Sequence, residues 1–177
     1  MESRAYTELG LSEGPVALRS RADTSPETCF VLDVDARPAG YVLALPYPAF
    51  RYPDLERAEE PGGPARRPGN LHLHDIVVAE RLRGRGLGRR LLNHLTLTAG
   101  AHGFERISLI AVGRSEPFWT THGFTAYPGI SPGGYGANAV YMSRPQVRGP
   151  QAGGPQARGP HVHGLHARGD GRVDETS

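Results

Sequence analysis

The sequence contains one cysteine and no lysine, so all 20 of its Lys+Arg residues are arginine. A single cysteine excludes an intramolecular disulfide framework and a zinc site built from several thiolates. Cys29 begins an apolar run, and we expect it to be a small buried side chain rather than a nucleophile. The absence of lysine excludes the nucleoside-triphosphate P-loop, which needs Gly-Lys-Ser/Thr at its end.

Long apolar segments are also missing. The chain has no run of about 20 apolar residues, so a transmembrane helix is not expected. The first residues, Met1 to Arg4, are not followed by the apolar core of a signal peptide. The formal net charge of +2 is too small to imply a nucleic-acid partner by itself. These absences predict a cytoplasmic protein that binds neither a membrane nor nucleic acid.

Glycine and proline, in contrast, are abundant, with 24 and 16 residues among 177. Together they make about 23% of the chain, just below the roughly 25–30% that is typical of low-complexity sequences. Much of this excess lies in a long loop over residues 46–70 and in the segment after residue 144. That segment repeats an Arg-Gly-Pro pattern without apolar periodicity, so burial cannot offset its ordering entropy. We predict one domain over residues 1–144, with its core at 29–144, and a disordered tail over 145–177.

Alternating strand and helix patterns predict an α/β fold with a mixed sheet flanked by helices. Apolar runs rich in β-branched residues indicate strands, and the leucines of residues 87–101 follow the i, i+4, i+8 spacing of one buried helix face. Pro15 and Pro117 stand where first helical turns are expected. The expected helices are 14–21, 87–101 and 115–122, and the expected strands are 29–34, 41–45, 71–78, 107–112, 124–127 and 139–143.

The most informative stretch joins the strand 71–78 to the helix 87–101, because its loop alternates arginine with glycine. Glycines let backbone N–H groups approach a ligand closely, and the positive end of the helix dipole favours an anion. The arginines add charge where a phosphate would lie. A dinucleotide-binding fingerprint fits poorly, because five residues separate Val78 from Gly84. An exposed, arginine-rich helix start without a ligand is the alternative.

Residues 83–88, Arg-Gly-Arg-Gly-Leu-Gly, match the Arg/Gln-x-x-Gly-x-Gly/Ala motif and resemble the Gcn5-related N-acetyltransferase (GNAT) superfamily. A second motif of that family, an aromatic pair closely followed by Gly-Phe, is similar to residues 118–124, and the resemblance spans about residues 29–144. It implies a GNAT fold, with the first strand missing or replaced because only 28 residues precede Cys29. It also implies acetyl-CoA as co-substrate, with the pyrophosphate on the loop amides and the pantetheine arm along a strand that splays from its neighbour. The residues implied to bind acetyl-CoA are Ile76, Val77, Val78, Arg83, Gly84, Arg85, Gly86, Leu87, Gly88 and Arg89.

A narrower resemblance lies on residues 70–78, where His72 and His74 form a His-x-His pair similar to that of arylalkylamine (serotonin) N-acetyltransferases. In those enzymes the two histidines are a proton relay, and on a strand both would point to one face. An imidazole near neutrality suits the removal of a proton from an alkylammonium group. A structural role for either histidine is the alternative. Asp75 cannot share their face on a regular strand, and the alternative role for it is a buried hydrogen bond to backbone near the 46–70 loop.

Trp119 stands where the GNAT family usually has the tyrosine that protonates the leaving thiolate. An indole N–H donates a hydrogen bond but is no acid at neutral pH, so Trp119 is predicted either to line the catalytic site or to anchor the core. Tyr135 and Tyr141 are further candidate proton donors.

These patterns together predict an acetyl-CoA-dependent N-acetyltransferase in which a primary amine attacks the acetyl carbonyl directly. The resemblance implies that a backbone N–H near Val78 stabilises the oxyanion. The expected substrate is a small arylalkylamine or polyamine-like molecule, and the expected state is a monomer or homodimer without a metal. The alternatives are a GNAT enzyme that acts on a peptide or protein N-terminus or another amine, and a non-catalytic acyl-CoA-binding module.

Overall fold

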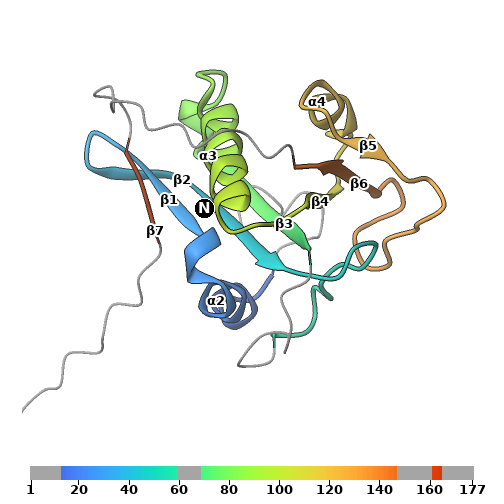
Figure 1. Cartoon of the computed structure of the whole chain (residues 1–177). Coiled ribbons are helices and arrows are strands. Elements are labelled where there is room, and N and C mark those ends of the chain that lie inside the picture. Colours follow the sequence, from blue (N-terminus) through green and yellow to red (C-terminus); the bar gives the residue numbers. More distant parts are fainter. Residues whose placement is uncertain (1–12, 60–68, 147–160, 165–177) are drawn as a thin grey trace, which may run out of the picture.

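A mixed seven-stranded sheet forms the centre of the fold, in the order β5-β6-β4-β3-β2-β1-β7 (Figure 1). The computed structural model describes residues 13–59, 69–146 and 161–164. The strands are β1 (Phe30–Val34), β2 (Arg37–Pro46), β3 (Asn70–Val78), β4 (Arg106–Ala111), β5 (Thr125–Ala126), β6 (Val140–Pro145) and β7 (His161–Gly164). The helices are α2 (Pro15–Thr24), α3 (Leu87–Ala101) and α4 (Glu116–Thr121), with short 3₁₀ turns η2 (Pro26–Thr28) and η3 (Glu80–Leu82). The predicted α/β fold with a mixed sheet flanked by helices is confirmed.

The main apolar core lies between α3 and the sheet. The buried residues of α3 are the ones expected from its periodicity, namely Leu87, Leu91, Leu92, Leu95 and Ala99. They pack against strand residues such as Leu71, Leu73 and Leu109, and each fully buried leucine contributes about 1.5–3 kcal/mol. Trp119 and Phe124 extend the same core toward α4.

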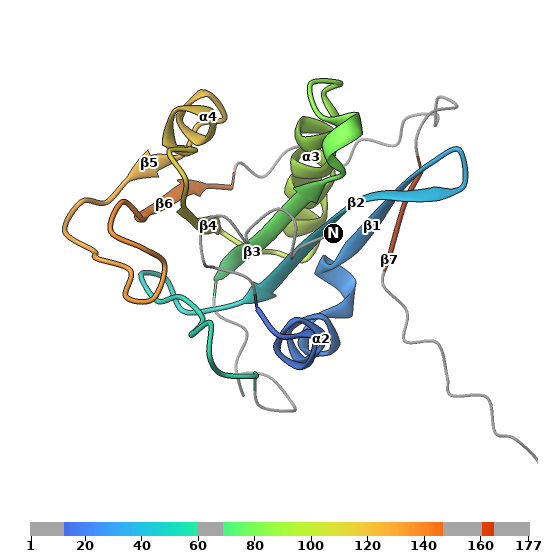
Figure 2. The same cartoon turned by 180° about the vertical axis from the view of Figure 1, so that it is seen from behind.

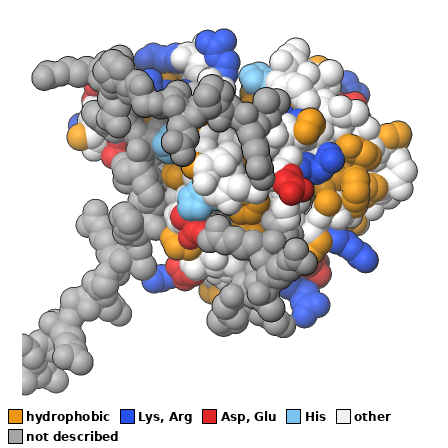
Figure 3. All heavy atoms as spheres, in the orientation of Figure 1, with side chains coloured by type: hydrophobic (Ala, Val, Ile, Leu, Met, Phe, Trp, Pro, Cys, Tyr) orange, Lys and Arg blue, Asp and Glu red, His pale blue; other side chains and the backbone are white. Residues whose placement is uncertain are grey.

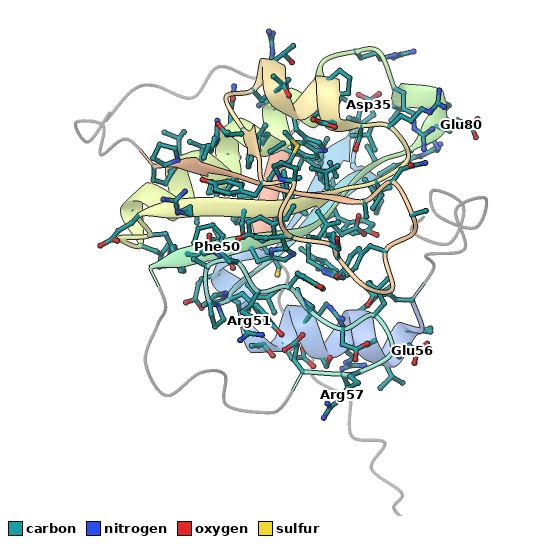
Figure 4. All side chains as sticks on the ribbon, turned by 90° about the vertical axis from the view of Figure 1, so that its right-hand side faces the viewer. Asp35, Phe50, Arg51, Glu56, Arg57 and Glu80 are labelled. Carbon is teal, nitrogen blue, oxygen red and sulfur yellow. The ribbon has the colours of Figure 1, made fainter. Side chains whose placement is uncertain are left out.

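The opposite face of the sheet is covered by α2 and by the segment 47–59. Figure 4, which views the sheet nearly edge-on, shows α2 below the strands and α4 above them. The segment 47–59, part of the long loop predicted over 46–70, contains neither helix nor strand. In the same view Phe50 lies near the strands, whereas Glu56 and Arg57 lie beside α2. The two faces of the sheet therefore have different covers, one apolar and helical and one irregular.

The second strand is longer than the predicted range 41–45. A two-residue turn at Asp35 and Ala36 joins β1 to β2, and both residues have left-handed φ angles, 51° and 58°. β2 therefore runs from residue 37 to Pro46 instead of covering only 41–45. The register shifts between Leu32 and Asp33, where Ala39 of β2 is the extra residue, next to Pro38, which cannot donate a hydrogen bond to the ladder.

Part of the predicted tail belongs to the sheet. β7 pairs antiparallel with β1, with Phe30 opposite Gly164. The prediction of a tail without structure is therefore wrong for residues 161–164, because an edge strand recruits a partner through its main chain and needs no apolar periodicity. Residues 147–160 and 165–177 lie outside the described residues, as do residues 1–12, so the missing first strand stays a prediction. In the part of the chain that the structure describes, no helix is both long and apolar enough to cross a membrane.

Candidate active site

The two parallel strands at the centre of the sheet separate partway along their length. β3 and β4 pair from Asn70 opposite Arg106 to Leu73 opposite Leu109, and their pairing ends there. β3 nevertheless continues to Val78, and Figure 2 shows the two strands diverging toward that end. A β3 backbone edge without a strand partner on that side can form hydrogen bonds with an extended ligand.

A cleft of about 420 Å³ opens beside this separation, between the end of β3, the start of α3 and α4. Its lining residues are Val78, Leu82, Arg83, Gly84, Gly86, Leu87, Gly88, Arg89, Phe118 and His122. Seven of the ten residues predicted to bind acetyl-CoA are among them. Three predicted residues, Ile76, Val77 and Arg85, do not line the cleft. Ile76 packs against the core, Val77 is buried, and Arg85 is exposed elsewhere on the loop.

The start of α3 offers uncapped backbone donors to this cleft. Gly86 is the N-cap residue, has a φ of 74°, and can supply no capping side chain, and the first turn contains no acidic residue. The first N–H groups of the helix therefore point out with no side-chain cap, which suits a phosphate. Figure 3 shows basic side chains gathered over this end of α3.

The glycines of the loop leave this space open. Gly84 and Gly86 have φ angles of 75° and 74°, which only glycine adopts without strain. Gly88 has no such constraint, yet a Cβ built on it would meet no atom within 4 Å. Packing within the protein therefore does not require glycine at position 88. The absence of a side chain there instead leaves room for a ligand to approach the backbone closely.

Three lining residues were missed by the analysis of the sequence, namely Leu82 and the ring pair Phe118 and His122. Phe118 is 43% exposed and packs on the imidazole of His122 with ring centroids 4.4 Å apart. Their signal was the one-turn spacing of two aromatic rings on α4, which brings them to one helix face. Trp119, between them in sequence, is 7% exposed, belongs to the core, and donates its indole N–H to Ser115 Oγ at 3.2 Å. Of the two interpretations left open for Trp119, the geometry favours the core anchor.

A β-bulge at His74 changes which residues share a face of β3. Leu43 of β2 lies opposite Asp75 and the next residue, Ala44, lies opposite Leu73, so His74 is the extra residue. Before the bulge the odd-numbered Leu73 belongs to the core, and after it the even-numbered Ile76 does. The expectation that Asp75 lies on the other face from His72 is therefore wrong. The Tyr41 hydroxyl donates to the Asp75 carboxylate on that face, which is a buried hydrogen-bond role.

His72 is buried on the face that α2 and the segment 47–59 cover. Its Nδ1 lies 3.1 Å from Ser108 Oγ, and Asn70 Nδ2 donates to the same oxygen at 2.9 Å. Burial, and then the positive charges that His74 and Arg21 can carry, lower the pKa of His72 well below its usual range. His72 is therefore neutral near pH 7 and acts as a hydrogen-bonding group.

His74 has a charged environment instead. Its Nε2 lies 2.5 Å from Glu13 Oε2, and its ring centroid is 6.3 Å from that of His72. The other carboxylate oxygen of Glu13 pairs with Arg21 Nη2 at 2.8 Å, and Glu59 lies 4.0 Å from Arg21 Nε. The Arg21 guanidinium is fully buried and also donates to the backbone carbonyl of Asp54 at 2.7 Å. We call Glu13, Arg21, Glu59 and His74 the charged cluster.

Aromatic side chains lie on the same face of the sheet. Phe50, with a φ of 64° that is strained for a bulky residue, packs on Tyr127 and Tyr141 at 5.3 and 5.9 Å between centroids. The Tyr141 hydroxyl accepts a hydrogen bond from the Phe50 N–H at 2.9 Å. The Tyr135 hydroxyl donates to the Pro53 carbonyl at 2.8 Å, and burial raises the pKa of Tyr135 above its usual value. Both candidate tyrosines thus already have hydrogen-bond partners.

The sequence and the fold of the chain are similar to those of known proteins. Residues 1–124 match the model of the acetyltransferase (GNAT) family. Ard1 from Thermoplasma volcanium has a similar structure, with a TM-score of 0.60 at 17% identity over 81% of this chain and 86% of that one. An acetyltransferase of the GNAT family from Staphylococcus aureus gives a TM-score of 0.56 at 12% identity over 82% and 87%.

A third structure is N-acetylglutamate synthase from Neisseria gonorrhoeae, complexed with coenzyme A and N-acetyl-glutamate. Its TM-score is 0.59 at 16% identity, over 83% of this chain and 32% of that chain, so the similarity covers about one third of that protein. At these identities the structural likeness shows the fold alone. With the family model matched over more than half of its length, the chain belongs to the GNAT acetyltransferase family.

Proposed function

We propose that this protein transfers the acetyl group of acetyl-CoA to the primary amine of a small arylalkylamine or polyamine-like molecule. The observation that carries the proposal is the position of the two halves of the site on opposite sides of the β3–β4 separation. The cleft with its uncapped helix start lies on one side, and His74, the first β3 residue after the pairing with β4 ends, belongs to the charged cluster on the other.

The chemistry follows from this arrangement. The alkylammonium substrate has a pKa of about 10 and must lose a proton before its nitrogen can attack. His74 takes that proton, the new C–N bond forms at the acetyl carbonyl, and the C–S bond breaks. The second amine proton leaves as the amide forms, and the CoA thiolate is protonated through solvent. One acetyl group moves and one proton is released overall.

The surroundings of His74 support a cationic, aromatic acceptor. Glu13 and Glu59 place two carboxylates on this face against one guanidinium, Arg21. The exposed ring of Phe50 lies on the same face and offers a π surface, while the buried ring of Tyr141 packs behind it. An ammonium group gains from both carboxylates and aromatic faces.

The test measures CoA thiol release from acetyl-CoA with arylalkylamines, polyamines and peptides as acceptors, for the full chain and for His74→Gln. We expect turnover with a small amine and a loss in kcat of about 10²–10⁴-fold in His74→Gln, which is the usual contribution of a general base. Acetyl-CoA binding by calorimetry should not change. The matched control is His94→Gln, because His94 lies on α3 and packs on Phe30 at 4.6 Å between ring centroids.

Three results would contradict the proposal. Acetyl-CoA binding without turnover on any amine would favour a binding module. Turnover on peptides alone would favour a protein N-terminus as acceptor. Full activity of His74→Gln would remove the proposed base.

A further inference from the structure

Glu13 precedes α2 and lies 61 residues from His74 in the sequence, yet the two side chains meet in the interior. The side chain of His74 is 3% exposed and that of Glu13 is 5% exposed. Their 2.5 Å contact joins Glu13 Oε2 to the outer ring nitrogen, Nε2, of His74. The inner ring nitrogen, Nδ1, is also buried and has no hydrogen-bond partner among the described residues.

A carboxylate on one ring nitrogen decides what the other nitrogen can do. A carboxylate accepts hydrogen bonds only, so the neutral imidazole carries its proton on Nε2 and exposes a lone pair on Nδ1. Nδ1 is the nitrogen nearer to the backbone of β3, and His74 is the bulged residue where β3 leaves β4. Glu13 thereby fixes the tautomer in which the base faces inward to the strand.

Arg21 explains why Glu13 acts as a hydrogen-bond acceptor and is not itself the base. The Arg21 guanidinium pairs with the second oxygen of Glu13 at 2.8 Å, so both carboxylate oxygens have cationic or N–H partners. Arg21 in turn donates to the carbonyls of Ala17, Asp54 and Arg57, which fixes it between α2 and the segment 47–59. Glu13 is thus held from two sides.

The charge balance of the cluster points the same way. With His74 neutral, the two carboxylates of Glu13 and Glu59 outnumber the single guanidinium of Arg21. One proton on His74 brings the four groups to neutrality. His72, the other titratable group near His74, is kept uncharged by burial, which lowers its pKa, and adds no compensating charge. The buried cluster can therefore accept the substrate's proton without acquiring a net positive charge.

We propose that Glu13 is a positioning residue for the base His74: it fixes the Nε2–H tautomer so that Nδ1 receives the proton of the amine, with Arg21 fixing Glu13. This inference rests on the proposed function, because it assigns a residue to that same proton transfer. Glu13 lies outside the motifs identified in the sequence.

The test compares Glu13→Gln with its matched control Glu59→Gln. Each removes one carboxylate charge next to Arg21, but only Glu13 contacts His74. The glutamine amide both donates and accepts, so the tautomer of His74 is no longer fixed. We expect Glu13→Gln to lower kcat about 10- to 100-fold with acetyl-CoA affinity unchanged, whereas Glu59→Gln, which removes a charge that attracts the amine but leaves the Glu13–His74 contact, should raise the KM for the amine and lower kcat several-fold less than Glu13→Gln. Added to His74→Gln, the Glu13→Gln change should have no further effect.

A second readout needs no substrate. The ¹⁵N spectrum of the His74 imidazole, identified by its disappearance in His74→Gln, should show Nε2 protonated and Nδ1 unprotonated in the wild type, and a tautomer mixture in Glu13→Gln. If Glu13→Gln does not fold, Glu13→Asp replaces it, since it keeps the charge for Arg21 and retracts the carboxylate from His74.

Wild-type kcat and an unchanged ¹⁵N spectrum in Glu13→Gln would overturn the positioning role while His74→Gln remains inactive. Equal losses in Glu13→Gln and Glu59→Gln would also overturn it, because the net charge alone would then matter. A fully active His74→Gln would instead overturn the proposed function, and the inference with it.

Discussion

The cleft at the start of α3 and the charged cluster lie on opposite faces of the sheet and are built differently. Most of the cleft comes from one continuous stretch, Val78 to Arg89, and uses backbone N–H groups, glycines and exposed arginines. The charged cluster is assembled from side chains of three separate segments, and its central residue, Arg21, is fully buried. In the first region the backbone N–H groups at the start of α3 have no side-chain cap, whereas in the second the charged side chains pair with one another.

Because of this difference, we expect charge in the cleft to affect ligand affinity and charge in the cluster to affect the stability of the fold. An exposed arginine in the cleft has water as an alternative partner, so its loss should affect a bound anion and little else. A buried arginine between two carboxylates has no such alternative, so its loss leaves uncompensated charges inside the protein.

Arg21→Met should destabilise the protein by about 3–5 kcal/mol, the cost of removing one partner of a buried ion pair. Glu13 and Glu59 would lose their cation, and the segment 47–59 would lose its hydrogen bonds to the guanidinium. Arg83→Met is the matched control: its Nε donates to the Val78 carbonyl at an exposed site at 3.4 Å. Urea unfolding measures both free energies, and calorimetry measures the affinity for acetyl-CoA.

For Arg83→Met we expect stability within about 0.5 kcal/mol of the wild type and an acetyl-CoA affinity about tenfold weaker. The contrast between the regions fails if Arg21→Met is as stable as the wild type. It also fails if Arg83→Met unfolds at lower urea while its affinity is unchanged.

Gly88→Glu should weaken acetyl-CoA binding by at least about 100-fold, because a carboxylate would enter the space left for phosphate and repel it. The same change should raise stability slightly, since glycine disfavours a helix and a carboxylate suits the first turn. The matched control is Gly100→Glu at the other end of α3, where a Cβ meets only Gln146 Nε2, at 3.7 Å. Its acetyl-CoA affinity should equal that of the wild type, and equal losses in both variants would move the phosphate site away from the start of α3.

The cleft could be predicted from the sequence because its determinants are local. Gly84, Gly86 and Gly88 lie within five residues of one another, and the leucine spacing of α3 fixed where the helix begins. Arg85 belongs to the same motif but does not line the cleft. The motif could not predict this, because it gives the positions of residues along the chain and not the direction of each side chain. Phe118 and His122 reach the cleft from α4, a separate element.

The charged cluster could not be predicted in the same way. The pair of His72 and His74 stood out as a motif, but their partners depend on contacts that join distant segments. The bulge at His74 reverses the alternation of β3, and nothing in the run from Leu71 to Val78 announces it. Glu13 and Arg21 lie in a stretch whose sequence indicated only a short helix. A regular strand was the simplest expectation and gave the wrong face for Asp75.

Two histidines differ in burial: His72 on the sheet is buried, whereas His94 on α3 is half-buried. Burial, followed by the charges of neighbouring His74 and Arg21, lowers the pKa of His72 well below 6.5, so the folded protein does not take up this proton where the unfolded chain does. Stability must then fall as the pH falls below about 6.5, with a slope of up to about 1.4 kcal/mol per pH unit for one proton. Above pH 7 both states are neutral at this residue and the contribution is flat.

Urea unfolding at steps from pH 8 to pH 5 gives the free energy of unfolding of the wild type and of His72→Gln as a function of pH. The difference between these two free energies is the contribution of His72. The difference should be constant above pH 7 and should shrink on the acid side, because only the wild type pays the protonation penalty. His94→Gln is the control: burial and the nearby charge of Arg90 also lower the pKa of His94, but its half-exposed ring should give a shallower acid slope. A difference curve for His72→Gln that is flat down to pH 5, or one shallower than that of His94→Gln, would mean that His72 can be charged in the folded state. The assignment of His72 as a neutral hydrogen-bonding group, distinct from the proton acceptor His74, would then be wrong.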